Sequence, residues 1–235
     1  MRLRLIIIGA VVAILAASAL AQKEIDKAAP LLVSFATDDG GTIYGDLYGN
    51  GRHGVVLVHG GRFNKESWAK QAPVLVKAGF RVLAIDLRGY GKSTGPGQKD
   101  VFTAPLHLDV LAAVRYLRTN GVKTVSLLGG SLGGGAAGDA VAHARPGEIS
   151  RMATLAGFWS HKRGEDISVP LLVIVTRDDA NADGLRLPAI QREFDKVPAK
   201  KELVVLEGKA HAQFMFDTPD SEKIMRMIIK FLKKH

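Results

Sequence analysis

Short apolar segments rich in Val, Ile and Leu recur along the chain, and between most of them apolar residues return every three or four positions. Such segments predict buried strands, whereas apolar residues at helical spacing predict amphipathic helices. The first two strands follow each other directly and the later ones alternate with helices, which is typical of an α/β fold with a mostly parallel sheet. The strands are predicted near residues 31–37, 42–48, 54–59, 81–86, 122–128, 150–156, 170–176 and 202–206. The helices are predicted near residues 65–78, 103–119, 132–144, 186–196 and 220–233.

The N-terminal residues differ from the rest of the chain. Two arginines precede a long apolar run, and the run ends in Ala19-Leu20-Ala21, which has the small residues of a signal-peptidase site. This order predicts a secretory signal peptide at 1–21 and an α/β domain at 22–235. The apolar run is rather long, so an uncleaved N-terminal membrane anchor is the alternative. We expect an exported protein, periplasmic or secreted, and the absence of cysteine is compatible with an oxidising compartment.

Length and composition limit the possible classes of function. The 235 residues, 47% of them hydrophobic, suit one domain with a substantial core. The formal net charge of +9 could favour nucleic acid or an anionic surface. However, the basic residues are mostly scattered, and no nucleic-acid motif or interleaved aromatic residues accompany them. Cysteine, H-E-x-x-H and clustered histidines are also absent from the sequence. We therefore expect no nucleic-acid partner, no metal and no cofactor.

The most specific chemical signal is Gly129-Gly130-Ser131-Leu132-Gly133, which follows a predicted strand and precedes a predicted helix. A G-x-S-x-G sequence in this context raises the serine on a strained strand-to-helix turn. Side chains two positions to either side would collide there, which explains the two outer glycines. Neither G-x-x-x-x-G-K-[S/T] nor G-x-G-x-x-G occurs in the chain, which weakens a phosphate-binding alternative. The motif predicts Ser131 as a nucleophile.

A serine nucleophile needs a histidine to take its proton and an acid to orient that histidine. Both residue types occur downstream of Ser131. The predicted strand that ends at residue 176 is followed by Asp178 and Asp179, with Asp183 further along the loop. The last predicted strand is followed by His211. No other histidine has the position that the mechanism requires.

The order of serine, acid and histidine, each after a predicted strand, resembles the α/β-hydrolase superfamily, and in particular its small lidless serine esterases. The resemblance covers roughly residues 30–234. It implies an eight-stranded, mostly parallel sheet with helices on both faces. The connection between the strands near 150–156 and 170–176 is too short for the cap domain that many relatives insert there. We therefore expect an α/β-hydrolase fold without a cap.

The resemblance also bears on the choice of acid. In this family the strand before the acid commonly ends in G-x-x-D or S-R-x-D, with the last residue as the acid. The sequence here is Thr176-Arg177-Asp178-Asp179, which implies Asp179. Asp178 is the second choice and Asp183 the third.

Roles for two further loops follow from the same resemblance. The backbone N–H of Leu132 would be one donor of an oxyanion hole. Gly61 would supply the other, with Arg62 as the alternative because the register of this loop varies. His59 would brace the loop. The stretch from His59 to Trp68 is similar to an H-G-x-x-x-x-x-x-x-W pattern, which implies that Trp68 anchors the core.

A second loop, from Asp86 to Ser93, resembles the D-x-R-G-x-G-x-S loop of these hydrolases. Polar residues in loops usually serve the turns around them. Asp86 and Arg88 are therefore expected to hold this loop by local hydrogen bonds, without a catalytic role.

These observations together predict a serine hydrolase, carboxylesterase-like, that cleaves small or short-acyl esters through an acyl-enzyme. Phe63, Phe158, Trp159 and Phe214 are candidate walls of an open site. The alternatives are an amidase, peptidase or lactone hydrolase on the same triad, or a non-catalytic binding protein of the same fold. The expected partner is a small-molecule ester, and a membrane only if the N-terminal segment is retained. The oligomeric state stays open.

Overall fold

The computed structural model describes residues 29–157 and 164–234. The predicted signal peptide at 1–21 lies outside these ranges, as do Phe158 and Trp159, two of the candidate walls. Within the described ranges, none of the helices has the length and apolar character needed to span a membrane.

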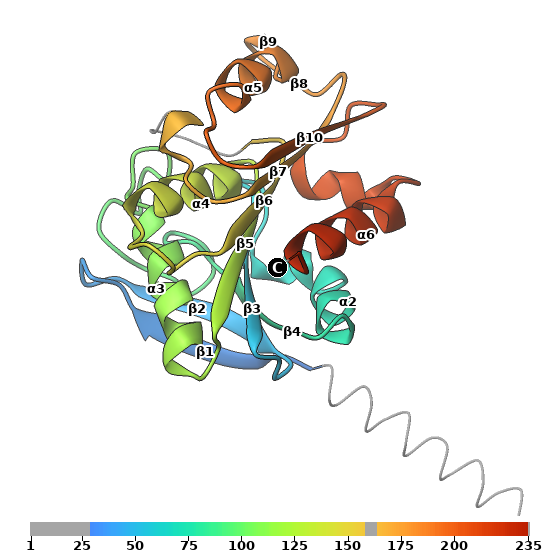
Figure 1. Ribbon diagram of the computed structural model, residues 1–235. Helices are drawn as coiled ribbons and strands as arrows, with labels where there is room; N and C mark the ends of the chain where they lie inside the picture. The colour runs from blue at the N-terminus through green and yellow to red at the C-terminus, as the bar shows by residue number, and fades with distance from the viewer. Residues whose placement is uncertain (1–28, 158–163, 235) are drawn as a thin grey trace, which may run out of the picture.

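Eight strands form one twisted sheet that crosses the molecule (Figure 1). Their order across the sheet is β1-β2-β4-β3-β5-β6-β7-β10. The pairs β1–β2 and β2–β4 are antiparallel, and all other neighbours are parallel. The strands are β1 (Leu31–Ala36), β2 (Thr42–Tyr48), β3 (His53–Val58), β4 (Phe80–Ile85), β5 (Thr124–Gly130), β6 (Arg151–Leu155), β7 (Leu171–Thr176) and β10 (Lys201–Leu206).

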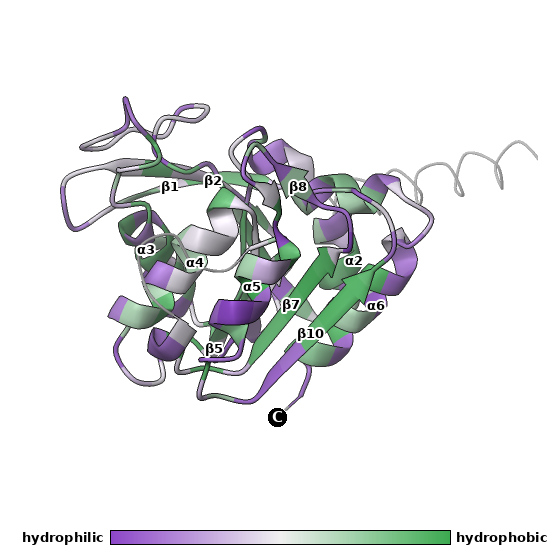
Figure 2. Cartoon of the chain, turned by 90° about the horizontal axis from the view of Figure 1, so that it is seen from above, coloured by the Kyte–Doolittle hydropathy of each residue, from purple (hydrophilic) through white to green (hydrophobic). Residues whose placement is uncertain are grey.

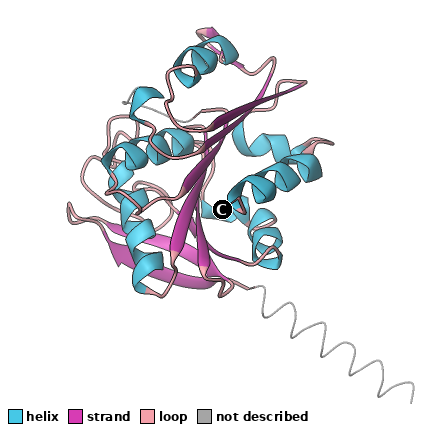
Figure 3. Cartoon of the chain, viewed as in Figure 1, coloured by secondary structure: helices cyan, strands magenta, loops and turns pink. Residues whose placement is uncertain are grey.

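Helices cover both faces of the sheet, as Figures 1 and 3 show. One face carries α3, α4 and α5, and the other carries α2 and α6. The α-helices are α2 (Gln71–Lys77), α3 (His107–Thr119), α4 (Leu132–His143), α5 (Leu187–Phe194) and α6 (Ser221–Leu232). Short 3₁₀ turns are η1 (Lys65–Trp68), η2 (Gly164–Asp166) and η3 (Ala212–Asp217).

The two cores follow from the alternation of side chains along each strand. In β3, Val56 and Val58 belong to the core beneath α3 and α4, whereas Val55 and Leu57 belong to the core beneath α2 and α6. All four are fully buried. Figure 2 shows β7 as hydrophobic along its length, while the helices around it mix hydrophobic and hydrophilic residues. A strand buried on both faces needs a continuous apolar sequence, and this is the pattern that predicted the sheet.

Two predicted helices are shorter than expected, and a proline explains each difference. The helix expected over 65–78 is divided into η1 and α2, with Pro73 in the first turn of α2. Proline is tolerated in a first turn but would break a helix that began at residue 65. The helix expected from residue 103 begins at His107, because Pro105 disfavours the helical conformation of the residue before it.

The sequence pattern also missed a small hairpin after β7. Strands β8 (Ala180–Asn181) and β9 (Gly184–Leu185) pair with each other and not with the main sheet. Each is too short to carry a periodic pattern. In the connection from β6 to β7, the described residues contain the turn η2 and no cap domain. The expected α/β-hydrolase fold, with a mostly parallel eight-stranded sheet and helices on both faces, is confirmed.

Because β3, β5, β7 and β10 run in the same direction, their carboxyl ends lie at one edge of the sheet. The loops after these strands carry His59, Ser131, Asp179 and His211, respectively. In open α/β sheets, ligand sites form at this edge.

Candidate active site

Ser131 is the single residue between β5 and α4. Its φ of 49° and ψ of −114° are rarely adopted by a residue with a side chain. The turn is tight on both sides. A methyl group on Gly129 would lie 2.4 Å from the carbonyl oxygen of Gly133, and one on Gly133 would lie 2.3 Å from that of Val58. The two outer glycines of the motif are therefore required by close approach of backbone.

A continuous chain of hydrogen bonds joins three side chains at the edge of the sheet. The Ser131 hydroxyl lies 2.7 Å from His211 Nε2, and His211 Nδ1 lies 2.7 Å from Asp179 Oδ2. The Asp179 side chain is 1% exposed, whereas that of His211 is 26% exposed. The carboxylate is thus sealed in the protein, and the imidazole and hydroxyl reach the surface of a cavity.

The structure distinguishes among the three aspartates that the sequence offered. Asp179 alone contacts His211. Asp178 is exposed, and its backbone N–H donates to the carbonyl oxygen of Gly208. Asp183 is exposed in the β8–β9 turn, where its side chain accepts a hydrogen bond from Asn181. The first choice of acid therefore has the required geometry, and the other two do not.

Arg186 is a second neighbour of Asp179 that the sequence analysis missed. Its backbone N–H donates to the Asp179 carbonyl oxygen at 2.8 Å, and its Nε lies 3.3 Å from Asp179 Oδ1. The hairpin formed by β8 and β9 returns the chain to the carboxylate, where Arg186 contacts Oδ1 and His211 contacts Oδ2. No periodic pattern marks this residue in the sequence.

The candidate oxyanion donors lie beside the serine. Leu132 is the first residue of α4, so its backbone N–H has no partner within the helix. In the loop after β3, neither Gly61 nor Arg62 donates its backbone N–H to an acceptor among the described residues. Gly61 adjoins Leu132, since a methyl group on Gly61 would lie 3.6 Å from Leu132 Cδ2. Tyr90 donates its hydroxyl to the Gly61 carbonyl oxygen at 2.9 Å and fixes the loop from the other side.

His59 holds the same loop from beneath. Its ring is fully buried, with Nδ1 donating to the Gly60 carbonyl oxygen at 2.9 Å and Nε2 accepting from the Leu87 N–H at 3.2 Å. Burial lowers the pKa of His59 to about 4. A neutral ring is the form that can both donate and accept. These contacts match the bracing role expected for His59.

Gln213 connects the histidine loop to the oxyanion loop, and it was not among the residues predicted for the site. Its side chain is buried, with Oε1 accepting from the Gly60 N–H at 3.3 Å and Nε2 donating to the Ser67 hydroxyl at 3.1 Å. It lies two residues after His211, in η3. A polar residue within the otherwise apolar run Ala212–Phe216 was the available signal.

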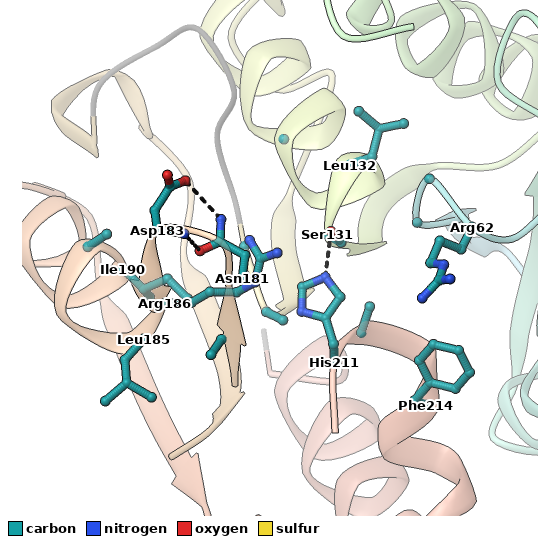
Figure 4. Close-up of a pocket in the computed structure, with 18 of the residues that line it drawn as sticks. Arg62, Ser131, Leu132, Asn181, Asp183, Leu185, Arg186, Ile190, His211 and Phe214 are labelled. Atoms are coloured by element: carbon teal, nitrogen blue, oxygen red, sulfur yellow. Dashed lines mark hydrogen bonds between the residues drawn. The ribbon is translucent and has the colours of Figure 1, made fainter. Parts of the chain in front are cut away.

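A cavity of about 1080 Å³ opens above the serine and histidine (Figure 4). Phe63 and Phe214 line it, as the sequence analysis expected, with ring centroids 4.8 Å apart. Phe102 and Leu185 also line it and are 72% and 54% exposed. Aromatic and aliphatic side chains thus form part of the wall, and charged and polar side chains, Arg186 among them, form the rest.

The loop from Asp86 to Ser93 differs from expectation in how it is held. Arg88 is fully buried and bonds to Asp109 on α3 and Asp39 in the β1–β2 turn, both distant in sequence. Asp86 accepts a hydrogen bond from the Lys65 N–H. The prediction that local bonds hold the loop is confirmed only in part. Arg88 donates to the nearby Pro96 carbonyl oxygen at 2.9 Å, but its other side-chain bonds and that of Asp86 reach residues distant in sequence. Trp68 is fully buried, as expected.

No group of three or more His, Cys, Asp or Glu side chains that could hold a metal ion occurs within residues 29–157 and 164–234.

The chain is similar in sequence and in fold to known proteins. The sequence profile of a family described as alpha/beta hydrolase fold matches residues 55–212. Among curated proteins, the chain is 28% identical over 187 residues to a non-heme haloperoxidase of Rhodococcus erythropolis, covering 78% of this chain and 61% of that protein. It is 30% identical over 188 residues to a non-heme chloroperoxidase of Streptomyces lividans, covering 78% and 57%, respectively. The chain spans less than two thirds of the length of either protein.

Solved structures share the fold at low sequence identity. The Pyrococcus furiosus esterase Pf2001 superposes with a TM-score of 0.71 at 22% identity, covering 88% of this chain and 93% of that one. The esterase RhEst1 of Rhodococcus sp. ECU1013 superposes with a TM-score of 0.66 at 16% identity, covering 86% and 98%, respectively.

Proposed function

The chain belongs to the α/β-hydrolase family, and from this premise we propose that it is a serine hydrolase that cleaves carboxylic esters through an acyl-enzyme. One observation carries the proposal. An unbroken chain of hydrogen bonds runs from the buried carboxylate of Asp179 through His211 to a serine hydroxyl at the floor of a cavity.

The geometry suits acyl transfer in two steps, formation of an acyl-enzyme and its hydrolysis. His211 Nε2 takes the proton of Ser131 as the hydroxyl oxygen attacks the ester carbonyl. Asp179 holds the imidazole through Nδ1 and stabilises its positive charge. The backbone N–H groups of Leu132 and Gly61 face the oxygen that becomes negative, with Arg62 as the other candidate donor. His211 then gives the proton to the leaving alcohol. Water, activated by the same histidine, cleaves the acyl-enzyme.

We propose short acyl chains as the preferred substrates, because the described part of the β6–β7 connection provides no cap over the cavity. An uncovered site offers a long chain little additional apolar surface to bury. With p-nitrophenyl esters of increasing acyl length, kcat/KM should fall steeply. Equal rates on long chains, with activation at a lipid interface, would contradict this preference.

The decisive experiment compares the parent protein with Ser131→Ala. Because the three groups act as a unit, removal of the serine should lower kcat by about 10⁴–10⁶-fold. The parent should also be labelled by a fluorophosphonate probe at Ser131, and the variant should not. An alanine variant that hydrolyses short aryl esters at the parent rate would refute the proposal. Aryl amides and lactones, assayed beside esters, separate amidase, peptidase or lactonase activity on the same triad.

A second candidate activity is halide peroxidation, which the names of the two curated relatives favour. In this site the acyl-enzyme could be attacked by hydrogen peroxide in place of water, which would give a peroxy acid and the free serine. Halogenation of monochlorodimedone in the presence of peroxide, bromide and acetate tests this activity. Activity that survives Ser131→Ala would exclude a route through the acyl-enzyme.

We also propose that the protein is exported and that cleavage after Ala21 removes the signal at 1–21. The basic residues before an apolar run and the Ala19-Leu20-Ala21 site support this. Mass determination of the N-terminus of the protein from its native source would distinguish cleavage from a retained membrane anchor.

A further inference from the structure

Three arginines line the cavity that holds Ser131. Arg62 comes from the loop after β3, Arg186 from the residue after β9, and Arg192 from α5. Figure 4 shows Arg62 and Arg186 on opposite sides of His211. The lining contains one exposed carboxylate, Asp183, which is bonded to Asn181. Arginine is charged at any pH at which the protein is folded, so the cavity holds a surplus of positive charge.

These arginines have fewer partners than several arginines outside the cavity, although the exposed Arg52 likewise forms no ion pair or side-chain hydrogen bond among the described residues. Neither Arg62 nor Arg192 forms an ion pair or side-chain hydrogen bond among the described residues. Arg186 contacts Asp179 through Nε alone, as an ion pair and not as a hydrogen bond, and its two terminal nitrogens have no acceptor among the described residues. By contrast, five arginines outside the cavity form ion pairs with carboxylates: Arg88, Arg115, Arg145, Arg177 and Arg226.

The arrangement has a consequence for the ligand. A neutral ester that covered Arg186 would remove its terminal N–H groups from water without giving them an acceptor, which is unfavourable. A carboxylate or similar anion would accept from the planar edge of the guanidinium and offset this cost. The apolar rim, with Phe102, Leu185 and Phe214, suits the carbon chain of such a substrate.

We propose that the substrates are esters that carry an anionic group, typically a carboxylate, on a short carbon chain, and that Arg186 binds this group with help from Arg62 and Arg192. The proposal rests on the proposed esterase function and names its substrate class. Arg186 is then a specificity-determining residue: its terminal nitrogens bind the substrate anion, while its Nε contacts the acid Asp179.

The test compares monoethyl glutarate with ethyl pentanoate, two ethyl esters of equal acyl length that differ by one carboxylate. A second pair, 4-acetoxybutyrate and butyl acetate, places the charge on the alcohol side. The measured quantity is the ratio of kcat/KM for the anionic ester to that for the neutral ester, determined by pH-stat titration. In the parent, at least one of the two ratios should be about 10, as expected for a charge-assisted hydrogen bond.

Variants then locate the anion site. Arg186→Gln should lower the ratio by about tenfold, and Arg62→Gln and Arg192→Gln by a few-fold each, because these two arginines are more exposed. Arg186→Lys should retain part of the ratio, since it keeps the charge but loses the planar edge. Arg226→Gln on α6 removes the same charge from a surface ion pair outside the cavity and should leave the ratio unchanged. Because Arg186 also touches Asp179, the ratio, and not the absolute rate, isolates substrate recognition.

The outcomes separate the two proposals. If both ratios are at or below 1 in the parent, or if the three cavity variants behave like Arg226→Gln, this inference is overturned while Ser131-dependent hydrolysis of ethyl pentanoate stands. If ethyl pentanoate is cleaved equally well by Ser131→Ala, the proposed function itself fails. A ratio that falls with added salt supports the inference, because ionic screening weakens an exposed ion contact.

Discussion

Two buried aspartates, Asp109 and Asp179, have the same residue type and nearly the same exposure, 0% and 1%, but different surroundings. Asp109 accepts three hydrogen bonds from Arg88, through the backbone N–H, Nε and Nη2. Arg88 is itself fully buried and also bonds to Asp39. This cluster is closed, since each group is satisfied by the protein.

Asp179 is instead the inner end of an open chain. Its partner His211 is partly exposed and forms a second hydrogen bond, through Nε2, with Ser131, which lines the cavity. Burial of a carboxylate therefore does not by itself indicate chemistry. The difference lies in whether its partner is a permanently charged arginine inside the fold or a histidine that can exchange a proton at a cavity wall.

The largest expected difference comes from replacing each aspartate by asparagine. Asp179→Asn should lower kcat by about 10⁴-fold, because the amide no longer favours the required tautomer and charge of the imidazole. Its midpoint of urea unfolding should change little by comparison. Asp109→Asn should reduce stability, while the protein that remains folded keeps near-parent kcat. Ester hydrolysis and urea unfolding on both variants measure the contrast, and an Asp179→Asn enzyme of parent activity would remove Asp179 from the mechanism.

The closed cluster can be tested through its cation. Arg88→Met should lower the free energy of unfolding by about 3–5 kcal/mol, because it leaves the Asp109 carboxylate buried without a partner. The double variant Arg88→Met/Asp109→Leu should recover much of this loss, since it removes both charges. Urea unfolding gives the values. A double variant no more stable than the single one would show that packing, and not charge, is what Arg88 supplies.

Acid should weaken the fold through His59 before it affects Asp39. The pKa of His59 is lowered to about 4 by burial, so the unfolded chain binds a proton between pH 6.5 and 4 that the folded protein does not. Stability should therefore fall as pH decreases through this window, by about 3 kcal/mol from this group. The pKa of Asp39 is held near 2, chiefly by its hydrogen bonds with Arg88, so its contribution is lost only below pH 3.8. In His59→Gln, the free energy of unfolding should no longer fall between pH 6.5 and 4, but it should still fall below pH 3.8. Urea unfolding measured across this pH range tests the prediction.

The smallest expected effect concerns Gln213, which couples the histidine loop to the oxyanion loop. Gln213→Ala should lower kcat by about tenfold and change KM little. The variant loses the hydrogen bonds that position the histidine loop relative to the oxyanion loop, but it loses no contact with the substrate. Gln213→Glu keeps the acceptor for the Gly60 N–H but loses the donor to Ser67, so it should lie between the parent and the alanine variant. Gln191→Ala, at an exposed position on α5, is the matched control. If kcat per folded molecule is unchanged in Gln213→Ala, the residue is merely structural.

Local pattern was sufficient for most of the fold. The inner strands β3 to β7 are buried on both faces, so their apolar segments can be recognised without any knowledge of neighbours. Predicted and observed strands agree within about two residues. Where the pattern misled, at residues 65–78 and 103–106, the reason was again local, since Pro73 and Pro105 limit where a helix can begin. The hairpin of β8 and β9 lacked any such signal.

The residues of the site also fall into two groups: those predicted from the sequence and those identified only by the tertiary structure. The sequence by itself determined Ser131, because the strained turn demands glycine at fixed spacing, and it determined the chain order of an acid and His211 after later strands. Only the tertiary structure decided that Asp179, and not Asp178, faces the imidazole, and that Arg186 and Gln213 join the site. The physical reason is that a turn is specified by the residues within it. By contrast, contacts such as that between Gly60 and Gln213 depend on loops that parallel strands bring to one edge of the sheet.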